Sequence, residues 1–191
     1  MAIPVSELQK INPSSKIELF EVQLDLALHG NSDTFRFHAG VNLNSNNTII
    51  WQGNAYQRFP VEATGFEYTS KGMIPRPVFR VSNVLSTITA LIIQVNSVTP
   101  GNDLIGAKFT RRITLASSLD NTNFASGTNP FGTPNSDEYP QEIFFINRKI
   151  SETRESVEFE LTNKFDVENK RIPARVVTRK LFPGVGTFVN A

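Results

Sequence analysis

The chain has 191 residues, no cysteine and a formal net charge of +1. This length suits one domain, with or without an appendage, and can bury a substantial core without covalent staples. The lack of cysteine excludes disulfides, iron–sulfur clusters and thiolate zinc sites, and it fits folding in a reducing cytoplasm.

Membrane and nucleic-acid functions are not favoured. Apolar runs fall far short of the ~20 residues of a membrane span, and residues 1–7 lack the features of a signal peptide. We therefore expect a soluble protein with no membrane span, not exported by the general secretory route. Because its basic clusters are short, we also expect no specific nucleic-acid site. These clusters are Lys108 with Arg111 and Arg112, and Lys170 and Arg171 with Arg175, Arg179 and Lys180.

Residues 1–15 predict an N-terminal arm, because they contain Pro4, Pro13 and several serines and show only weak periodicity. An arm of this kind is ordered only where something ties it down, and in an assembly a neighbouring subunit could do so. The domain itself is expected over residues 16–180, followed by a C-terminal tail at 181–191.

Residues 16–27 predict the first strand. Apolar and polar side chains alternate over residues 21–26, which is the two-residue period of a strand with one buried face. The alternation fails at residues 19–20, so we expect a bulge or bend there. Turn-forming residues at 30–33, followed by a second alternating strand at 35–38, predict a hairpin.

The centre of the chain predicts short strands and then one helix. Strands are expected at residues 48–51, 56–59, 66–68 and 78–81. Pro60 is expected to end the second of these. Ser82 or Asn83 is a good helix N-cap, and apolar residues then recur at three- and four-residue steps. This spacing is typical of an amphipathic helix over about residues 83–97.

The last third of the chain predicts further strands around a long loop. Strands are expected at residues 107–115, 142–147 and 157–161. Residues 116–140 are rich in Asn, Ser, Thr, Gly and Pro, and a loop of this length is usually either functional or disordered. We expect it to contact other subunits, and we expect deletion of residues 120–137 to leave the fold intact.

These elements together predict a mainly β fold. Roughly nine or ten short strands and one helix favour an antiparallel β-barrel or sandwich with the helix on a flank or end.

Reactive groups are sparse. His29 and His38 are expected to be partly exposed at strand ends, without the spacing of a metal pair. Residues 120–123 are similar to an oxygen-rich calcium loop but lack its glycine and its bidentate glutamate, so a turn is the better interpretation. We assign no catalytic, cofactor-binding or metal residue, and expect neither a cofactor nor enzyme activity.

Glutamates near the C-terminal end offer one catalytic alternative. Paired carboxylates in a cleft can hydrolyse a glycan, but a solvated strand face explains the pattern better. The cluster consists of Glu152, Glu155, Glu158 and Glu160.

Trp51 precedes a turn at residues 52–54 and could stack on a sugar. At such a place a Trp more often closes a β core, with its indole N–H bonded at the edge, and we favour that interpretation.

Several segments of the sequence form a specific pattern with little reactive chemistry. They are Trp51, Gln52 and Gly53 with Tyr56; Gly65, Phe66 and Glu67; Gly72, Arg76 and Pro77 through to Val81, Ser82 and Asn83; and Phe159 to Leu161 with Pro173, Ala174 and Arg175. In residue identity and spacing this pattern resembles the phage minor tail protein L family of lambdoid long-tailed phages.

The resemblance implies a β-barrel domain of the tail-tube type in a structural virion protein of the tail tip, assembled in the host cytoplasm. It implies a ring of identical subunits around the tail channel, with a trimer favoured and a hexamer possible. The implied partners are the distal tail protein ring above and the central hub or fibre protein below.

The sequence departs from the family in one respect. Typical members continue past the segment at residues 173–175 into a cysteine-rich module thought to carry an iron–sulfur cluster. This chain has no cysteine, so the cluster does not carry over. Either the protein dispenses with that module or the chain is a shortened form.

Two alternatives to a tail-tip ring protein remain. One is a carbohydrate-binding module of a phage tail that uses Trp51 or a loop aromatic such as Phe131. The other is a glycan hydrolase that uses the cluster of glutamates at residues 152–160.

Overall fold

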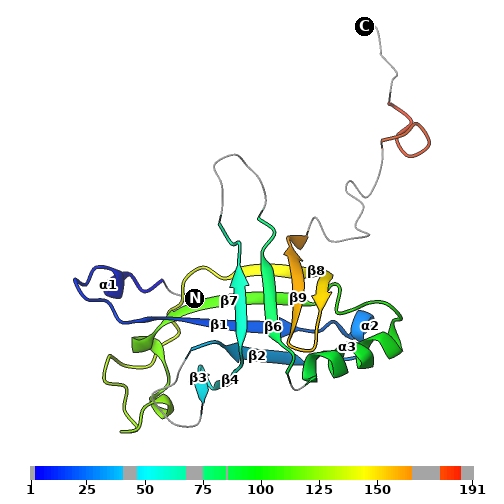
Figure 1. The fold of residues 1–191 in the computed structure, drawn as a ribbon. Coiled ribbons are helices and arrows are strands. Elements are labelled where there is room, and N and C mark those ends of the chain that lie inside the picture. The colour runs from blue at the N-terminus through cyan, green and yellow to red at the C-terminus, as the bar shows by residue number, and fades with distance from the viewer. Residues whose placement is uncertain (1–2, 41–46, 68–74, 85, 165–176, 186–191) are drawn as a thin grey trace, which may run out of the picture.

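The structure, a computed structural model, describes residues 3–40, 47–67, 75–84, 86–164 and 177–185 (Figure 1). Strands dominate it, and one helix is much longer than the others, so the predicted mainly β fold with one amphipathic helix is confirmed. The strands are β1 (Lys16–Gln23), β2 (Thr34–His38), β3 (Thr48–Trp51), β4 (Asn54–Arg58), β5 (Val61–Thr64), β6 (Val78–Ser82), β7 (Lys108–Leu115), β8 (Glu142–Glu152) and β9 (Ser156–Thr162). The helices are α1 (Val5–Leu8), α2 (Leu26–His29) and α3 (Thr87–Val98), and η1 (Ala116–Ser118) and η2 (Asn121–Asn123) are 3-10 turns.

All the strands belong to one mixed, open sheet of nine strands in the order β3-β4-β2-β1-β7-β8-β9-β6-β5. Neighbouring strands are antiparallel except for β2 and β4, which run parallel. The predicted hairpin at the start of the chain is confirmed, because β1 pairs with β2 and Phe20 lies opposite Phe37.

The sheet curls until its two ends meet at Phe59 and Pro60. These two residues alone separate β4, which belongs to one end of the sheet, from β5, which forms the other edge. The N–H of Phe59 donates to the carbonyl of His38 at 3.0 Å, while the carbonyl of Pro60 accepts from the N–H of Ser82 at 2.9 Å. The ends are therefore joined by one continuous piece of chain in place of a strand ladder.

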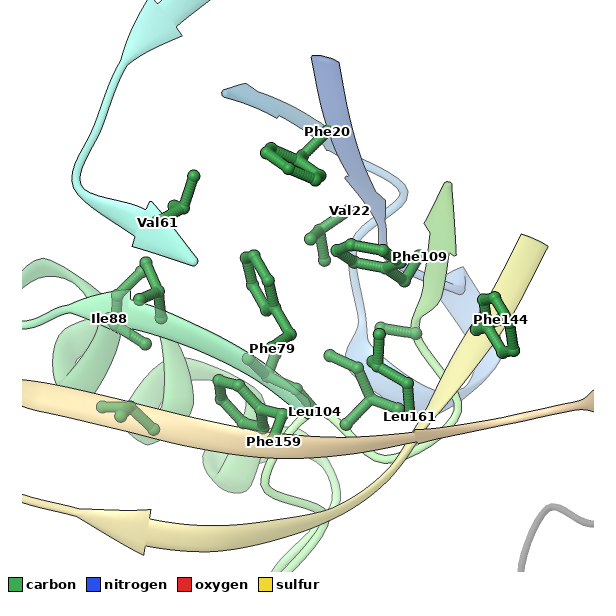
Figure 2. Close-up of a cluster of buried hydrophobic side chains, with 14 of the residues drawn as sticks. Phe20, Val22, Val61, Phe79, Ile88, Leu104, Phe109, Phe144, Phe159 and Leu161 are labelled. Carbon is green, nitrogen blue, oxygen red and sulfur yellow. The ribbon is translucent and has the colours of Figure 1, made fainter. Parts of the chain in front are cut away.

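Aromatic rings fill the space enclosed by the curled sheet (Figure 2). Phe109 is fully buried, and its ring centroid lies 4.9 Å from that of Phe79, 6.0 Å from Phe20 and 6.3 Å from Phe66. Offset and tilted ring contacts at such distances add stability beyond the apolar area they bury. Nine of the 15 phenylalanines of the chain belong to this core or pack against it.

A second hydrophobic cluster covers the other side of β1. Phe20 and Val22 belong to the main core, whereas Leu19 packs with Trp51 and Tyr56 in the second cluster. The predicted bulge at residues 19–20 is wrong, because β1 pairs with β7 without a register shift from Lys16 to Gln23. The alternation fails there because both faces of the strand are buried.

Helix α3 closes the main core through Ile88, Ile92 and Val95, which are all buried. It begins later than predicted, with Ser86 at the N-cap. Asn83 still tethers the start of the helix, because its side chain accepts from the N–H of Thr89 at 3.3 Å and donates to the Thr89 hydroxyl at 2.8 Å.

Other element boundaries also differ from the sequence predictions. The predicted strand at 16–27 ends at Gln23, and the leucines that extend the alternation lie around helix α2, whose N-cap Asp25 accepts from the N–H of Ala27. The predicted strand at 66–68 is absent at Phe66 and Glu67, while an edge strand forms at β5 directly after Pro60. A proline is tolerated there because an edge strand needs fewer ladder donors.

Replacing Phe109 with alanine is expected to lower the free energy of unfolding by about 3–5 kcal/mol, because it opens a cavity among packed rings. Phe182→Ala is the matched control, since Phe182 is 43% exposed and should change stability by less than about 0.5 kcal/mol. Urea unfolding of both variants measures the difference. A loss at Phe109 no larger than at Phe182 would contradict this account of the core.

Candidate assembly interface

The long loop after β7 is built by asparagine side chains. Asn129 is buried, and its amide donates to the carbonyls of Ala116, Ser117 and Leu119 at 2.9–3.2 Å. Asn123 is also buried and exchanges two hydrogen bonds with the backbone of Ile50 in β3, at 2.6 and 2.7 Å. The loop is therefore ordered by buried bonds to itself and to the sheet.

Asp120 holds the turn between β3 and β4. Its carboxylate accepts from the N–H of Gln52 at 3.2 Å and from the N–H of Gly53 at 2.9 Å. Both turn residues have positive φ, 50° and 72°, which is typical of a two-residue hairpin turn. Leu119 and Phe124 pack beside Trp51 in the second cluster, so deletion of residues 120–137 would expose that cluster. This packing argues against the expectation that the fold survives the deletion, and we now expect the deletion to destabilise the domain.

A partly buried network of charges underlies the same region. Glu21 accepts the Tyr56 hydroxyl at 2.6 Å and pairs with the guanidinium of Arg112 at 3.3 Å. Arg112 also donates to both oxygens of Glu138, at 3.0 and 3.1 Å, and lies over the ring of Trp51. Burial raises the pKa of Tyr56, and the bond to Glu21 raises it further. Burial opposes the charge of Arg112, but its two carboxylate partners outweigh burial and raise its pKa.

A groove of about 750 Å³ runs beside the place where the ends of the sheet meet. We call it the seam groove. Its lining residues come from the start of β1, the end of β2, β5 and the loop: Ser15, Lys16, Ile17, Glu18, Phe20, His38, Ala39, Gly40, Ile49, Val61, Glu62, Ala63, Ala116, Leu119, Asn123, Phe124 and Phe131. The groove lies along β5. In the described part of the chain this edge strand pairs with β6 on one side and with no strand on its outer side.

The predicted N-terminal arm carries exposed apolar side chains. Ile3, Val5, Leu8 and Ile11 are 49–106% exposed around helix α1. The base of the arm is fixed to the loop, because the Ser14 hydroxyl donates to the Ser117 hydroxyl at 3.0 Å.

A second exposed apolar surface lies at the opposite end of the sheet, around α2 and α3 (Figure 1). This helix-end surface consists of Leu26, Leu28, Ile93 and Val98, which are 40–65% exposed. The two helices are joined by a hydrogen bond from the Thr99 hydroxyl to the carbonyl of Leu28 at 2.8 Å.

Both histidines are buried, which corrects the expectation of partly exposed strand-end residues. His29 accepts from the N–H of Asp25 at 2.9 Å, and its other ring nitrogen lies 3.1 Å from the carbonyl of Ile105. His38 is fully buried, and its Nε2 lies 3.2 Å from the carbonyl of Asn47. Burial lowers the pKa of His38, and the charge of Arg58 lowers it further.

Three of the four glutamates of the hydrolase alternative, Glu152, Glu158 and Glu160, are held in ion pairs. Glu160 accepts from Arg148 at 2.9 and 3.0 Å, and Glu158 accepts from Arg80 at 2.7 Å. Burial alone would raise the pKa of Glu160, but bonds from Asn147 and Arg148 lower it. A general acid needs the opposite shift, so these contacts favour the structural interpretation.

The remaining candidates also have structural roles. Trp51 is 1% exposed and cannot stack on a sugar, which confirms its place in a core, although its indole N–H has no acceptor within the described residues. The side-chain oxygens of Asp120 and Asn123, from the segment similar to a calcium loop, accept hydrogen bonds from the backbone of β3 and its turn.

The first basic cluster is neutralised in part, because Arg111 pairs with Glu18 and Glu142 at 2.6 and 2.8 Å. Most of the second, Lys170, Arg171 and Arg175, lies outside the described residues, as do Gly72 and residues 173–175 of the sequence pattern. No helix among the described residues is long and apolar enough to cross a membrane.

The family model for phage minor tail protein L matches residues 28–185, which is most of the chain. The chain belongs to the phage minor tail protein L family. Over 133 residues it is 29% identical to the tail tip protein L of Escherichia phage lambda. That alignment covers 68% of this chain and 52% of the lambda protein, so the chain spans about half the length of this relative.

Family membership makes the chain a phage tail protein and thus a virion component. The iron–sulfur cluster expected of typical tail protein L members does not fit these residues, because the chain has no cysteine thiolate to hold it.

Sequence reasoning missed the roles of Asp120, Asn123 and Asn129 in this family member. The only available signal was the abundance of Asn and Asp in the loop, which is typical of any turn.

Replacing Asp120 with asparagine is expected to lower the free energy of unfolding by about 1–3 kcal/mol, because charge-assisted hydrogen bonds to two N–H groups are weakened. Trp51 is the only tryptophan, so its fluorescence follows this region directly. Asp137→Asn, at a half-buried carboxylate in the same loop, is the matched control and should leave both readouts unchanged. Equal effects of the two substitutions would contradict the role of Asp120.

The buried imidazole of His38 predicts a pH dependence of stability. Its folded pKa lies below the ordinary value of about 6.5, so only the unfolded chain gains a proton as the pH falls below that value. The contribution of neutral His38 to the free energy of unfolding is fully present above pH 6.5. As the pH falls below that value, the free energy of unfolding decreases by up to about 1.4 kcal/mol per pH unit. Urea unfolding between pH 7.5 and 5 measures this slope, and His38→Gln should flatten it. An unchanged slope in that variant would refute the assignment.

Proposed function

We propose that this chain is a structural protein of the phage tail tip, which forms a ring around the tail channel. In this role it joins the distal end of the tail tube to the central hub or fibre protein. Membership of the minor tail protein L family supports the proposal, as does similarity to a relative named for the tail tip.

One observation carries the ring proposal: two different apolar surfaces lie at opposite ends of the same curled sheet (Figure 1). The arm lies at one end and the helix-end surface at the other. When two different surfaces of one molecule bind each other, copies associate head to tail, and such contacts generate rings if the rotation closes. Exposed side chains such as Ile11 and Leu26 would be covered in this arrangement.

The division of the chain follows from this role. Residues 1–15 would serve as the arm, residues 16–180 as the β domain that lines the channel, and residues 181–191 as a C-terminal tail. We favour a trimer over a hexamer, with assembly in the cytoplasm of the host, for which a chain without cysteine is suited.

Light scattering of the purified chain tests the ring, with a mass of three or six copies expected. Replacing Val5 and Leu8 of the arm with aspartate should leave a folded monomer, because each substitution places a charge in an apolar contact. Ile143→Asp is the control, since Ile143 is 43% exposed on β8, opposite Thr110 of β7, and belongs to neither surface.

A parent chain that stays monomeric at all concentrations would contradict the ring. A full-sized assembly of the arm variant would instead contradict the role of the arm.

A further inference from the structure

We propose that the seam groove receives the segment Val177–Val185 of a second copy of the chain. The proposal rests on the proposed ring for the presence of a neighbour, but it concerns surfaces distinct from the arm and the helix-end surface. It assigns a partner to the groove and a role to the C-terminal part of the chain.

The groove is suited to an apolar peptide. Its walls include Phe20, Val61, Phe124 and Phe131, and the Phe131 ring is 49% exposed beside the buried Phe124, at a centroid distance of 6.0 Å. One side of the groove is the outer edge of β5, an edge strand that pairs only with β6 in the described part of the chain. Such edges are usually covered by another piece of chain.

The segment has the matching character. Within nine residues it exposes four apolar side chains, namely Val177, Leu181, Phe182 and Val185, which are 37–61% exposed. A local turn gives it a defined shape, because the N–H groups of Leu181 and Phe182 both donate to the carbonyl of Thr178, at 3.0 and 2.8 Å. In Figure 1 this segment stands away from the curled sheet.

Charge also matches between the groove and the segment. Glu18 and Glu62 lie on the rim of the groove, and Glu62 is exposed. The ammonium of Lys16, which shares the rim, lies 5.3 Å from the ring centroid of Tyr139. Exposed Arg179 and Lys180 directly precede the apolar pair Leu181 and Phe182 in the segment. Glu18 already pairs with Arg111, so Glu62 is the rim carboxylate that seating this pair among the groove aromatics would bring close to positive charge, which favours this register.

A second copy is the occupant we infer, because the proposed ring brings copies of the chain close together and the segment stands away from its own sheet in Figure 1. That proximity raises the local concentration of the segment and makes a short apolar contact sufficient. The exchange would also cover a strand edge that the curled sheet leaves open.

Disulfide trapping tests the contact, since the chain has no cysteine of its own. Chains with Phe131→Cys are mixed with chains carrying Phe182→Cys under mild oxidation, and the disulfide-linked heterodimer is quantified by mass. We expect a yield at least about tenfold above that of a control mixture. The control pairs Phe182→Cys with Ile143→Cys, which is 43% exposed on β8 and lies outside the groove lining, the arm and the helix-end surface. A second mixture uses Glu62→Cys in place of Phe131→Cys. Glu62 lies on the rim of the groove, so its substitution does not disturb the core.

The outcomes separate this proposal from the ring. A yield equal to that of the control from both groove positions overturns the exchange, even where light scattering shows an intact ring. A chain carrying both cysteines that gives only an internal disulfide also overturns it, because the occupant is then the chain's own segment. If light scattering shows no assembly at all, the ring itself fails.

Charge reversal gives a second test. Glu62→Lys should lower the rate of cross-linking by about fivefold, the effect expected of one exposed charge pair, and Lys180→Glu on the partner chain should restore it. Glu155→Lys, an exposed carboxylate outside the groove lining, is the matched control. Absence of rescue by Lys180→Glu contradicts the proposed register of the segment.

Discussion

The junction at Phe59 and Pro60 is the constraint on which the rest of the structure depends. Hydrogen bonds to His38 on one side and Ser82 on the other fix both ends of the sheet to the same short stretch of chain. A nine-stranded sheet fixed in this way has to curl, and curling creates an enclosed space that only large side chains can fill. The phenylalanine core, the position of α3 and the seam groove all follow from that closure.

Burial of β1 on both faces has a second effect. The main core occupies one face, and the hairpin of β3 and β4 occupies the other, together with the loop that follows β7. Three side chains, Asp120, Asn123 and Asn129, give this loop its order by satisfying backbone groups that would otherwise be buried without partners. The loop is thus a structural layer of the domain that also lines part of the seam groove, which is one of the three surfaces that we propose for partners, together with the arm and the helix-end surface.

Local sequence pattern predicted elements that short-range periodicity or turn residues are enough to specify. Alternation located β9, three- and four-residue spacing located α3, and turn residues located the hairpin of β1 and β2. Prediction failed where distant segments decide burial: Leu19 and Phe20 looked like a bulge, and His29 and His38 looked exposed. Order in the loop was also missed, because nothing in an asparagine-rich run reveals that its amides bond to β3 and to carbonyls several residues away.

The separation of the two apolar surfaces has a geometric consequence. A domain built on a curled, densely packed sheet cannot easily flex, so the angle between its two apolar surfaces is a fixed property of the fold. In the proposed ring, that angle sets the rotation from one subunit to the next and therefore the number of subunits that completes a circle. Copy number would then depend on the curvature of the sheet more than on the strength of any contact.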